Sequence, residues 1–388
     1  MTIMYNNGKP RTGIGASQLN PHVFERKALI EAQNEMYFSQ LADTTNMPKN
    51  SGTQIKQYRH VPVIDDRNKG GWGLDARGVR YEHGNLYGSS KDIGLISDKF
   101  PVLGELGGRV NKIDFTRLEL VSNLTKFGMF YEFSADAERF DTEADLISHC
   151  SRELMNTAVQ VYEDKLQIDL LTNAGTVKYA GSATQASELA EGMELSYAGL
   201  IKLGIDLDKT RTPKQTEIIT GTRMIDTKVL PACRIAYVGS ELIPSLMAMK
   251  DYHNEAAWLP VEKYAGGTTL LNGEFGAIAG FRIIVVPNMF KWGGAGANAT
   301  NATYYNTNGK YDVFPFLVVG DKAFTTVGFQ TDGKTNKFKI ITKDAGGEAT
   351  ATRDEPYGET GFSSMKWFYG FMPQFIERMA LIKVVAKM

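Results

Sequence analysis

The stretch that decides the fold runs from Thr142 to Thr172 and reads TEADLISHCSRELMNTAVQVYEDKLQIDLLT. Its apolar residues recur every three or four positions, which predicts one amphipathic helix with a capping-box-like start at Thr142 and Asp145. Roughly thirty residues at about 1.5 Å each give a rod of about 45 Å, much longer than the average globular helix. The expected buried stripe consists of Leu146, Ile147, Cys150, Leu154, Ala158, Val161, Tyr162, Leu166, Leu170 and Leu171.

The chain before this helix contains three kinds of segment. Residues 1–20 are polar and rich in glycine, which favours a flexible arm, and helical spacing of apolar residues predicts an amphipathic helix over 21–42. Because this helix follows a loose arm, we expect it to pack against parts of the molecule other than its immediate neighbours in the sequence. The run TQIKQYRHVPV predicts an extended strand, and residues 109–134, rich in β-branched and aromatic side chains, predict further strands.

Residues 61–105 form a long stretch rich in glycine and charge and poor in aliphatic side chains. Such a stretch cannot bury enough apolar area to form a core of its own. A loop of this length in a compact domain is usually either functional or disordered. Its aromatic residues Trp72, Tyr81 and Tyr87 argue against plain disorder, because they gain free energy by contacting another surface.

Beyond the long helix, helical and strand patterns alternate. We expect a surface connection over 176–192, helices near 197–208 and 240–250, and a strand at RIAYVG between them. This order predicts an α/β subdomain over about 190–320, including a polar loop rich in glycine and asparagine before Tyr311. The final residues carry the strand-like runs AFTTVGFQ, NKFKIITK and FIERMALIKVV.

The glycine cluster LLNGEFGAIAGFRIIVVPNM, Leu270–Met289, bears on whether this subdomain binds a cofactor. Gly273, Gly276 and Gly280 have a spacing that differs from the dinucleotide-binding fingerprint. That fingerprint also needs a helix after the glycines, whereas Phe281 to Val286 predicts a strand. The cluster is therefore interpreted as a turn that leads into a strand.

Composition excludes several classes of function. The chain has 388 residues and a formal net charge of −1, with 43 basic and 44 acidic side chains, so nothing favours strong DNA binding through clustered cations. Cys150 and Cys233 fit no metal-binding spacing and are interpreted as buried free thiols. Neither a signal peptide nor a membrane span is recognisable, so we expect a soluble protein made in a cytoplasm.

No catalytic, cofactor or metal site is predicted from the motifs. The phosphate-loop and nucleophile-elbow patterns do not occur, and the five histidines lack partners at metal-binding intervals. Two acidic pairs, Asp65-Asp66 and Glu163-Asp164, are interpreted as solvated or salt-bridged surface groups, the second on the polar side of the long helix.

Four stretches nevertheless resemble one known family, the major capsid proteins of tailed phages, and most closely those of the N4-like podophages. In chain order they are MPKNSGTQI at Met47–Ile55, GNLYGSSKDIG with GGRVNKIDFTR between Gly84 and Arg117, LTKFGMFYEFS at Leu124–Ser134, and LNGEFGAIAGFRIIVVPN at Leu271–Asn288. MKWFYGFMPQFIERMALIKVV is a weaker C-terminal counterpart.

The resemblance implies an α+β chain with the tailed-phage and herpesvirus-type major capsid fold. It divides the chain into an N-arm with an amphipathic helix (1–48), an E-loop (49–108), P-domain strands with a spine helix (109–190), an α/β A-domain (191–320) and C-terminal P-domain strands (321–388). Copies would assemble as hexamers and pentamers into an icosahedral virion shell around double-stranded DNA, in the bacterial host cytoplasm. Scaffolding, portal and decoration proteins are possible partners.

Contacts between subunits are then expected in the E-loop, because buried aromatic and arginine side chains dominate interface energies. The candidates are Arg67, Trp72, Arg77, Arg80, Tyr81 and Tyr87. These side chains could instead pack on their own subunit. Three other functions stay open: an encapsulin-like nanocompartment shell, an α/β enzyme with its site in 190–320, and a phage tail or decoration protein.

Overall fold

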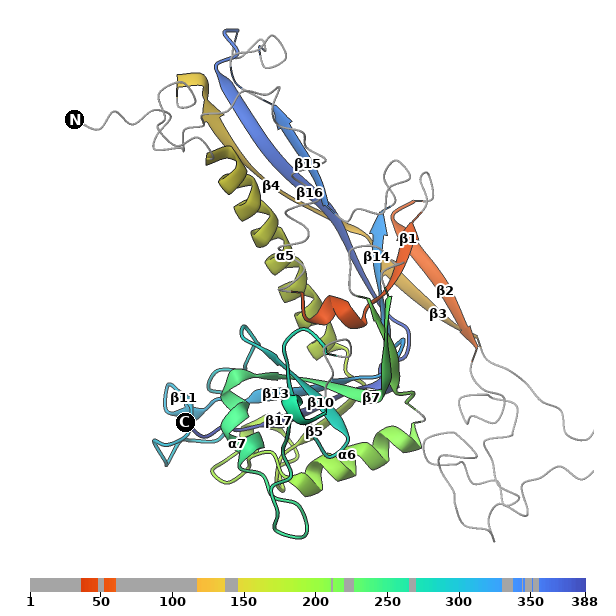
Figure 1. The fold of residues 1–388 in the computed structure, drawn as a ribbon, viewed down its shortest axis with the longest axis vertical. Helices are drawn as coiled ribbons and strands as arrows, with labels where there is room; N and C mark the ends of the chain where they lie inside the picture. Colours follow the sequence, from red (N-terminus) through yellow and green to blue (C-terminus); the bar gives the residue numbers. More distant parts are fainter. Residues whose placement is uncertain are drawn as a thin grey trace, which may run out of the picture.

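The computed structural model describes residues 36–47, 52–60, 117–136, 146–210, 212–219, 227–264, 270–329, 338–343, 345, 351 and 356–388. One long helix, a five-stranded sheet and an eight-stranded sheet dominate this part of the chain (Figure 1). The helix α5 (Leu146–Thr172) runs beside the five-stranded sheet and ends at the eight-stranded one. The predicted α+β class is confirmed.

The helix α5 has 27 residues, which corresponds to about 40 Å. Its described part confirms the amphipathic spacing, because Ala158, Tyr162, Leu166 and Leu170 are buried. Val161 was wrongly assigned to this stripe: it is 38% exposed, while Met155 and Val159 are buried instead. The stripe passes through 155, 159, 162, 166 and 170, the spacing that keeps one face of a helix inward. The predicted capping residues lie outside the described part.

The five-stranded sheet is organised around its longest strand, β16. The first half of β16 lies between β15 and β4, and its second half pairs with β14, which in turn pairs with β1. The β1–β14 pair is parallel and the other pairs are antiparallel. The strands are β1 (Asp43–Met47), β4 (Thr125–Ser134), β14 (Phe324–Phe329), β15 (Phe338–Lys343) and β16 (Thr360–Pro373).

The eight-stranded sheet has the order β5-β17-β13-β7-β10-β9-β8, with β6 also paired to β7. It combines strands from three parts of the sequence, since β5 and β17 join the strands of residues 215–319. Its strands are β5 (Thr176–Tyr179), β6 (Gln215–Ile219), β7 (Thr227–Gly239), β8 (Leu259–Pro260), β9 (Glu274–Ile278), β10 (Phe281–Val286), β13 (Phe314–Val319) and β17 (Met379–Val384).

Both faces of this sheet are buried. Along β7, Ile235 and Tyr237 belong to the hydrophobic cluster that includes α5, while Ala236 and Val238 belong to a second cluster on the opposite face. The second cluster includes Leu200, Leu203 and Leu207 of α6 (Tyr197–Lys209), and Leu246 of the short helix α7 (Ile243–Met247). Burial on both sides explains why these strands are continuous apolar runs without alternation.

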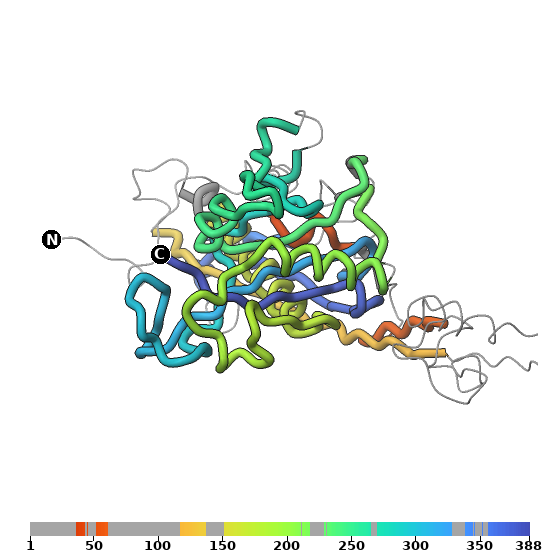
Figure 2. Tube along the Cα trace, turned by 90° about the horizontal axis from the view of Figure 1, so that it is seen from below, coloured from red at the N-terminus to blue at the C-terminus, as the bar shows by residue number. Residues whose placement is uncertain are grey.

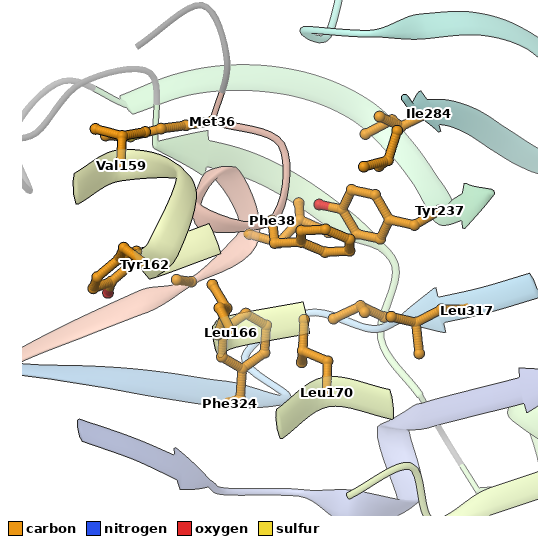
Figure 3. Packing of buried hydrophobic residues seen from close by; sticks show 14 of the residues in the cluster. Met36, Phe38, Val159, Tyr162, Leu166, Leu170, Tyr237, Ile284, Leu317 and Phe324 are labelled. Carbon is orange, nitrogen blue, oxygen red and sulfur yellow. The ribbon is translucent and has the colours of Figure 1, made fainter. Parts of the chain in front are cut away.

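The helix predicted over 21–42 is wrong for the described residues 36–42 and untested before them. The described part of this N-terminal segment contains the 3-10 turn η3 (Phe38–Leu41), followed directly by β1, while residues 1–35 lie outside the described part. Figure 3 shows Phe38 packed beside Tyr237, close to Leu166 of α5, and the Phe38 and Tyr237 ring centroids are 4.6 Å apart. The expected packing away from immediate neighbours is confirmed for Phe38.

The interpretation of the glycine cluster as a turn is confirmed. β9 and β10 form an antiparallel hairpin in which Ile278 pairs with Phe281. Ala279 and Gly280 occupy the turn with φ of 50° and 82°, the left-handed region that favours glycine. Gly276 serves packing, because a Cβ there would overlap the Trp258 ring.

The remaining elements are short, apart from one exposed ribbon. Two predictions were too simple: the expected connection 176–192 contains β5, and the polar loop before Tyr311 includes a small hairpin. The helix near 240–250 is confirmed only as η5 followed by α7. The bounds are β2 (Gln54–His60), β3 (Arg117–Asn123), β11 (Asn306–Thr307), β12 (Lys310–Tyr311), η4 (Ala186–Glu188), η5 (Ser240–Leu242), η6 (Val261–Lys263) and η7 (Ile376–Arg378).

Candidate assembly surfaces

The antiparallel pair β2–β3, called the ribbon below, projects from the rest of the molecule (Figures 1 and 2). Its strands pair in full register, from Gln54 opposite Asn123 to His60 opposite Arg117. Residues 61–116 connect the far ends of these two strands and lie outside the described part. The six predicted contact residues all belong to that connection: Arg67, Trp72, Arg77, Arg80, Tyr81 and Tyr87.

The outer face of the ribbon is mostly polar, although Tyr58 and Val121 are exposed on it, and it carries cross-strand pairs. Lys56 Nζ lies 2.5 Å from Glu119 Oε1, and the guanidinium of Arg117 lies 4.0 Å from the centre of the Tyr58 ring. The hydrogen bond to Glu119 raises the pKa of Lys56 above its ordinary value. Alternating exposed and half-buried positions along β2 place Ile55, Gln57 and Arg59 on the opposite, inner face.

The inner face contacts the segment Gln374–Arg378, called the junction below, which links β16 to β17. Arg59 forms an ion pair with Glu377 and donates to the Gln374 carbonyl oxygen at 3.3 Å. Its guanidinium lies 4.3 Å from the centre of the Phe375 ring, and that of Arg378 lies 3.7 Å from the same centre. These residues were not predicted from the sequence, because no periodic pattern links positions so far apart in the chain.

Glu163 of α5 is buried, so its interpretation as a surface group is wrong. Its carboxylate accepts from the Phe38 N–H at 2.8 Å, from the Ser39 N–H at 3.3 Å and from the Ser39 hydroxyl. The Tyr237 hydroxyl donates to the Tyr37 carbonyl oxygen at 2.9 Å. Burial, with Glu163 nearby, raises the pKa of Tyr237 well above its ordinary value. These contacts fasten the N-terminal segment to α5 and β7.

A second buried polar cluster lies on the β9–β10 hairpin. Arg282 donates to both carboxylate oxygens of Glu274 at 2.5 Å, and the Tyr264 hydroxyl donates to the same carboxylate at 2.7 Å. Cys233 is a buried free thiol, as predicted, and burial raises the pKa of this thiol. Because Arg282 and Tyr264 both bind the Glu274 carboxylate, the arrangement fits a structural cluster better than an activated nucleophile.

An apolar groove of about 540 Å³ lies between the C-terminal half of α5 and the eight-stranded sheet. Ile168, Val177 and Phe290 line it and are 46%, 44% and 38% exposed. Lys383 Nζ lies 4.3 Å from the Trp292 ring centre at this groove, and burial lowers the pKa of Lys383. On the described part of the molecule, this groove therefore combines exposed apolar side chains with two lysines, Lys291 and Lys383.

Within the described ranges, no group of three or more His, Cys, Asp or Glu side chains is placed to hold a metal ion. The same ranges contain no helix that is both long enough and apolar enough to cross a bilayer.

The solved structures that share this arrangement define the class of fold. The capsid of Ralstonia phage GP4 superposes with a TM-score of 0.58 at 12% identity, covering 100% of this chain and 99% of that one. The capsid of cyanophage P-SCSP1u gives 0.52 at 11% identity, covering 90% and 88%. At such low identity the likeness shows the fold alone, which is that of tailed-phage capsid proteins.

Sequence comparisons add the family. The model described as "Phage capsid protein" matches residues 118–384, and the major capsid protein of Pseudomonas phage KPP21 is 50% identical over 392 residues. That alignment covers 99% of this chain and 98% of the relative. The chain therefore belongs to the phage capsid protein family, whose members are structural proteins and not enzymes. Neither the enzyme nor the encapsulin-like alternative is favoured.

Proposed function

We propose that the chain is the major shell subunit of a tailed phage and assembles as hexamers and pentamers into an icosahedral capsid around double-stranded DNA. The observation that carries this proposal is the 50% identity, over nearly the whole length of both chains, to the major capsid protein of Pseudomonas phage KPP21. A net charge of −1 fits a container that holds DNA by confinement and not by sequence-specific contacts.

The proposed parts of the subunit are the N-arm (1–48), E-loop (49–108), P-domain (109–190 with 321–388) and A-domain (191–320). A ribbon that carries the connection 61–116, and a long helix beside a sheet, support the E-loop and spine-helix assignments. Membership in the N4-like group, supported by the four ordered stretches, is part of the proposal. So are assembly in the host cytoplasm and partnership with scaffolding, portal and decoration proteins.

Assembly of the purified full-length chain tests the shell function. Light scattering and negative-stain imaging are expected to show closed particles, from the chain alone or with candidate scaffold partners. Particles from infected cells are expected to hold nuclease-protected DNA. Monomers under all these conditions would refute the shell function. Native particles that hold a protein cargo in place of DNA would refute the proposal that the shell encloses a genome.

The six residues of the 61–116 connection are proposed to contact a neighbouring subunit, led by Trp72 and Tyr87. Substituting both residues by alanine removes two large aromatic contacts and is expected to lower the assembled fraction at least about tenfold. Substituting both by phenylalanine is the matched control and should preserve assembly. Wild-type assembly by the double alanine variant would refute this assignment.

A further inference from the structure

The junction is held rigidly between the two sheets. Backbone hydrogen bonds fix it from two sides: the Gly175 N–H donates to the Ile376 carbonyl at 3.0 Å, and the Gly320 N–H donates to the Arg378 carbonyl at 2.9 Å. The Phe375 N–H in turn donates to the Ala323 carbonyl at 2.9 Å. A group that binds the junction is therefore tied to a fixed point of the molecule.

The ribbon is attached to the molecule at two places. The first is its root, where β3 continues through Leu124 into β4 and the Ser122 hydroxyl donates to the Phe371 carbonyl at 2.9 Å. The second is the Arg59–junction contact, since Arg59 pairs across the ribbon with Leu118. At about 3.3 Å per residue, the second attachment lies roughly 13 Å from the Ser122 hydrogen bond and roughly 20 Å from Leu124. Two attachments this far apart fix the direction in which the ribbon leaves the subunit.

Charge makes the second attachment depend on Glu377. Two guanidinium groups, Arg59 and Arg378, contact the same Phe375 ring, and burial lowers the pKa of Arg378. The carboxylate of Glu377 pairs with Arg59 and offsets the repulsion between the two cations. The side chains of Arg59 and Glu377 are 14% and 27% exposed, so solvent screens this ion pair only in part. The Gln374 amide adds one hydrogen bond to Gln57 at 3.3 Å.

We propose that the contact of Arg59 with Glu377 and Phe375 sets the angle at which the ribbon leaves the subunit, and through that angle the curvature and diameter of the shell. The inference rests on the proposed function, in which the connection 61–116 meets a neighbouring subunit. Arg59, Phe375 and Glu377 are thus positioning residues: they act through the direction of the ribbon, whatever residues touch the neighbour.

The test compares Glu377→Gln with Glu119→Gln in the full-length chain. Each variant removes one carboxylate from an ion pair of the same ribbon, on the inner face for Glu377 and on the outer face for Glu119. Glu377→Gln is expected to speed amide hydrogen exchange at 54–60 about tenfold in the unassembled chain and to broaden the distribution of shell diameters. Glu119→Gln should leave the diameters unchanged.

A conservative variant separates loss of the carboxylate from general damage. Glu377→Asp keeps a carboxylate on the junction and is expected to exchange more slowly at 54–60 than Glu377→Gln and to give more uniform shells, and exchange in β13 shows that each variant is folded. Wild-type exchange and diameters in Glu377→Gln would overturn the proposal. If the wild-type chain formed no shells, the proposed function would fail, while the exchange comparison would still decide whether this contact holds the ribbon.

Discussion

The most informative single perturbation is the removal of the buried Glu163 carboxylate. Glu163→Ala leaves the Phe38 N–H, the Ser39 N–H and the Ser39 hydroxyl without this acceptor inside the protein. A buried donor without a partner costs about 1–3 kcal/mol. Because the hydroxyl can rotate toward another acceptor, we count the two backbone donors and expect a loss of about 3–4 kcal/mol in the free energy of unfolding.

Two variants set the scale for this measurement. Glu163→Gln keeps an acceptor oxygen but loses the charge, and should cost about 1–2 kcal/mol. Glu153→Ala, at an exposed position of the same helix, should stay within about 0.5 kcal/mol of wild type. The assay is urea unfolding of the unassembled full-length chain, with hydrogen exchange of residues 36–42 to localise the effect. A Glu163→Ala value equal to that of Glu153→Ala would refute the role of this carboxylate.

Three further outcomes are expected in thermal or urea unfolding. Gly204→Ala within α6 should add about 0.5–1 kcal/mol, because the new methyl group meets only ordinary contact distances; a loss of stability would contradict this. Gly175→Ala should cost about 1–3 kcal/mol, because its Cβ would overlap the Ile376 carbonyl; unchanged stability would show that the junction is soft. Burial alone would raise the pKa of Asp312, but hydrogen bonds from Lys291 and the Gly294 N–H outweigh burial and lower this pKa on balance. The ionised Asp312 therefore stabilises the fold fully above about pH 4, and this contribution is lost as the pH falls through the folded-state pKa. Asp312→Asn should therefore be less stable than wild type at pH 7 by about 1–3 kcal/mol, with a gap that narrows below about pH 4; a gap that does not change with pH would contradict the assignment.

The elements that could be predicted from the sequence are those in which burial produces a recognisable pattern of apolar side chains. The helix α5 and the apolar strands β7, β10 and β17 were recognisable because burial imposes a helical period on the first and near-continuous apolar runs on the others. No strand was predicted at β16, part of which was noted only within the C-terminal stretch MKWFYGFMPQFIERMALIKVV that resembles the family. Small residues, Gly361 and Ser363, occupy inward positions of its alternating pattern and weaken the apolar signal.

Contacts between distant segments could not be predicted from local patterns. Glu163 has the chemistry of a surface residue, and only the arrival of Phe38 and Ser39 from 124 to 125 positions away makes it an internal acceptor. Arg59 and Glu377 meet across 318 positions for the same reason. The six proposed contact residues were chosen from composition alone and stay a prediction.

The central claim is that copies of this chain form a closed shell through the ribbon and the connection that it carries. Cryo-electron microscopy of particles assembled from the full-length chain tests this most directly. We expect hexamers and pentamers in a closed icosahedral shell, with residues 61–116 of each subunit lying against a neighbour. A shell in which these residues contact only their own subunit, or a chain that never assembles, would contradict the account.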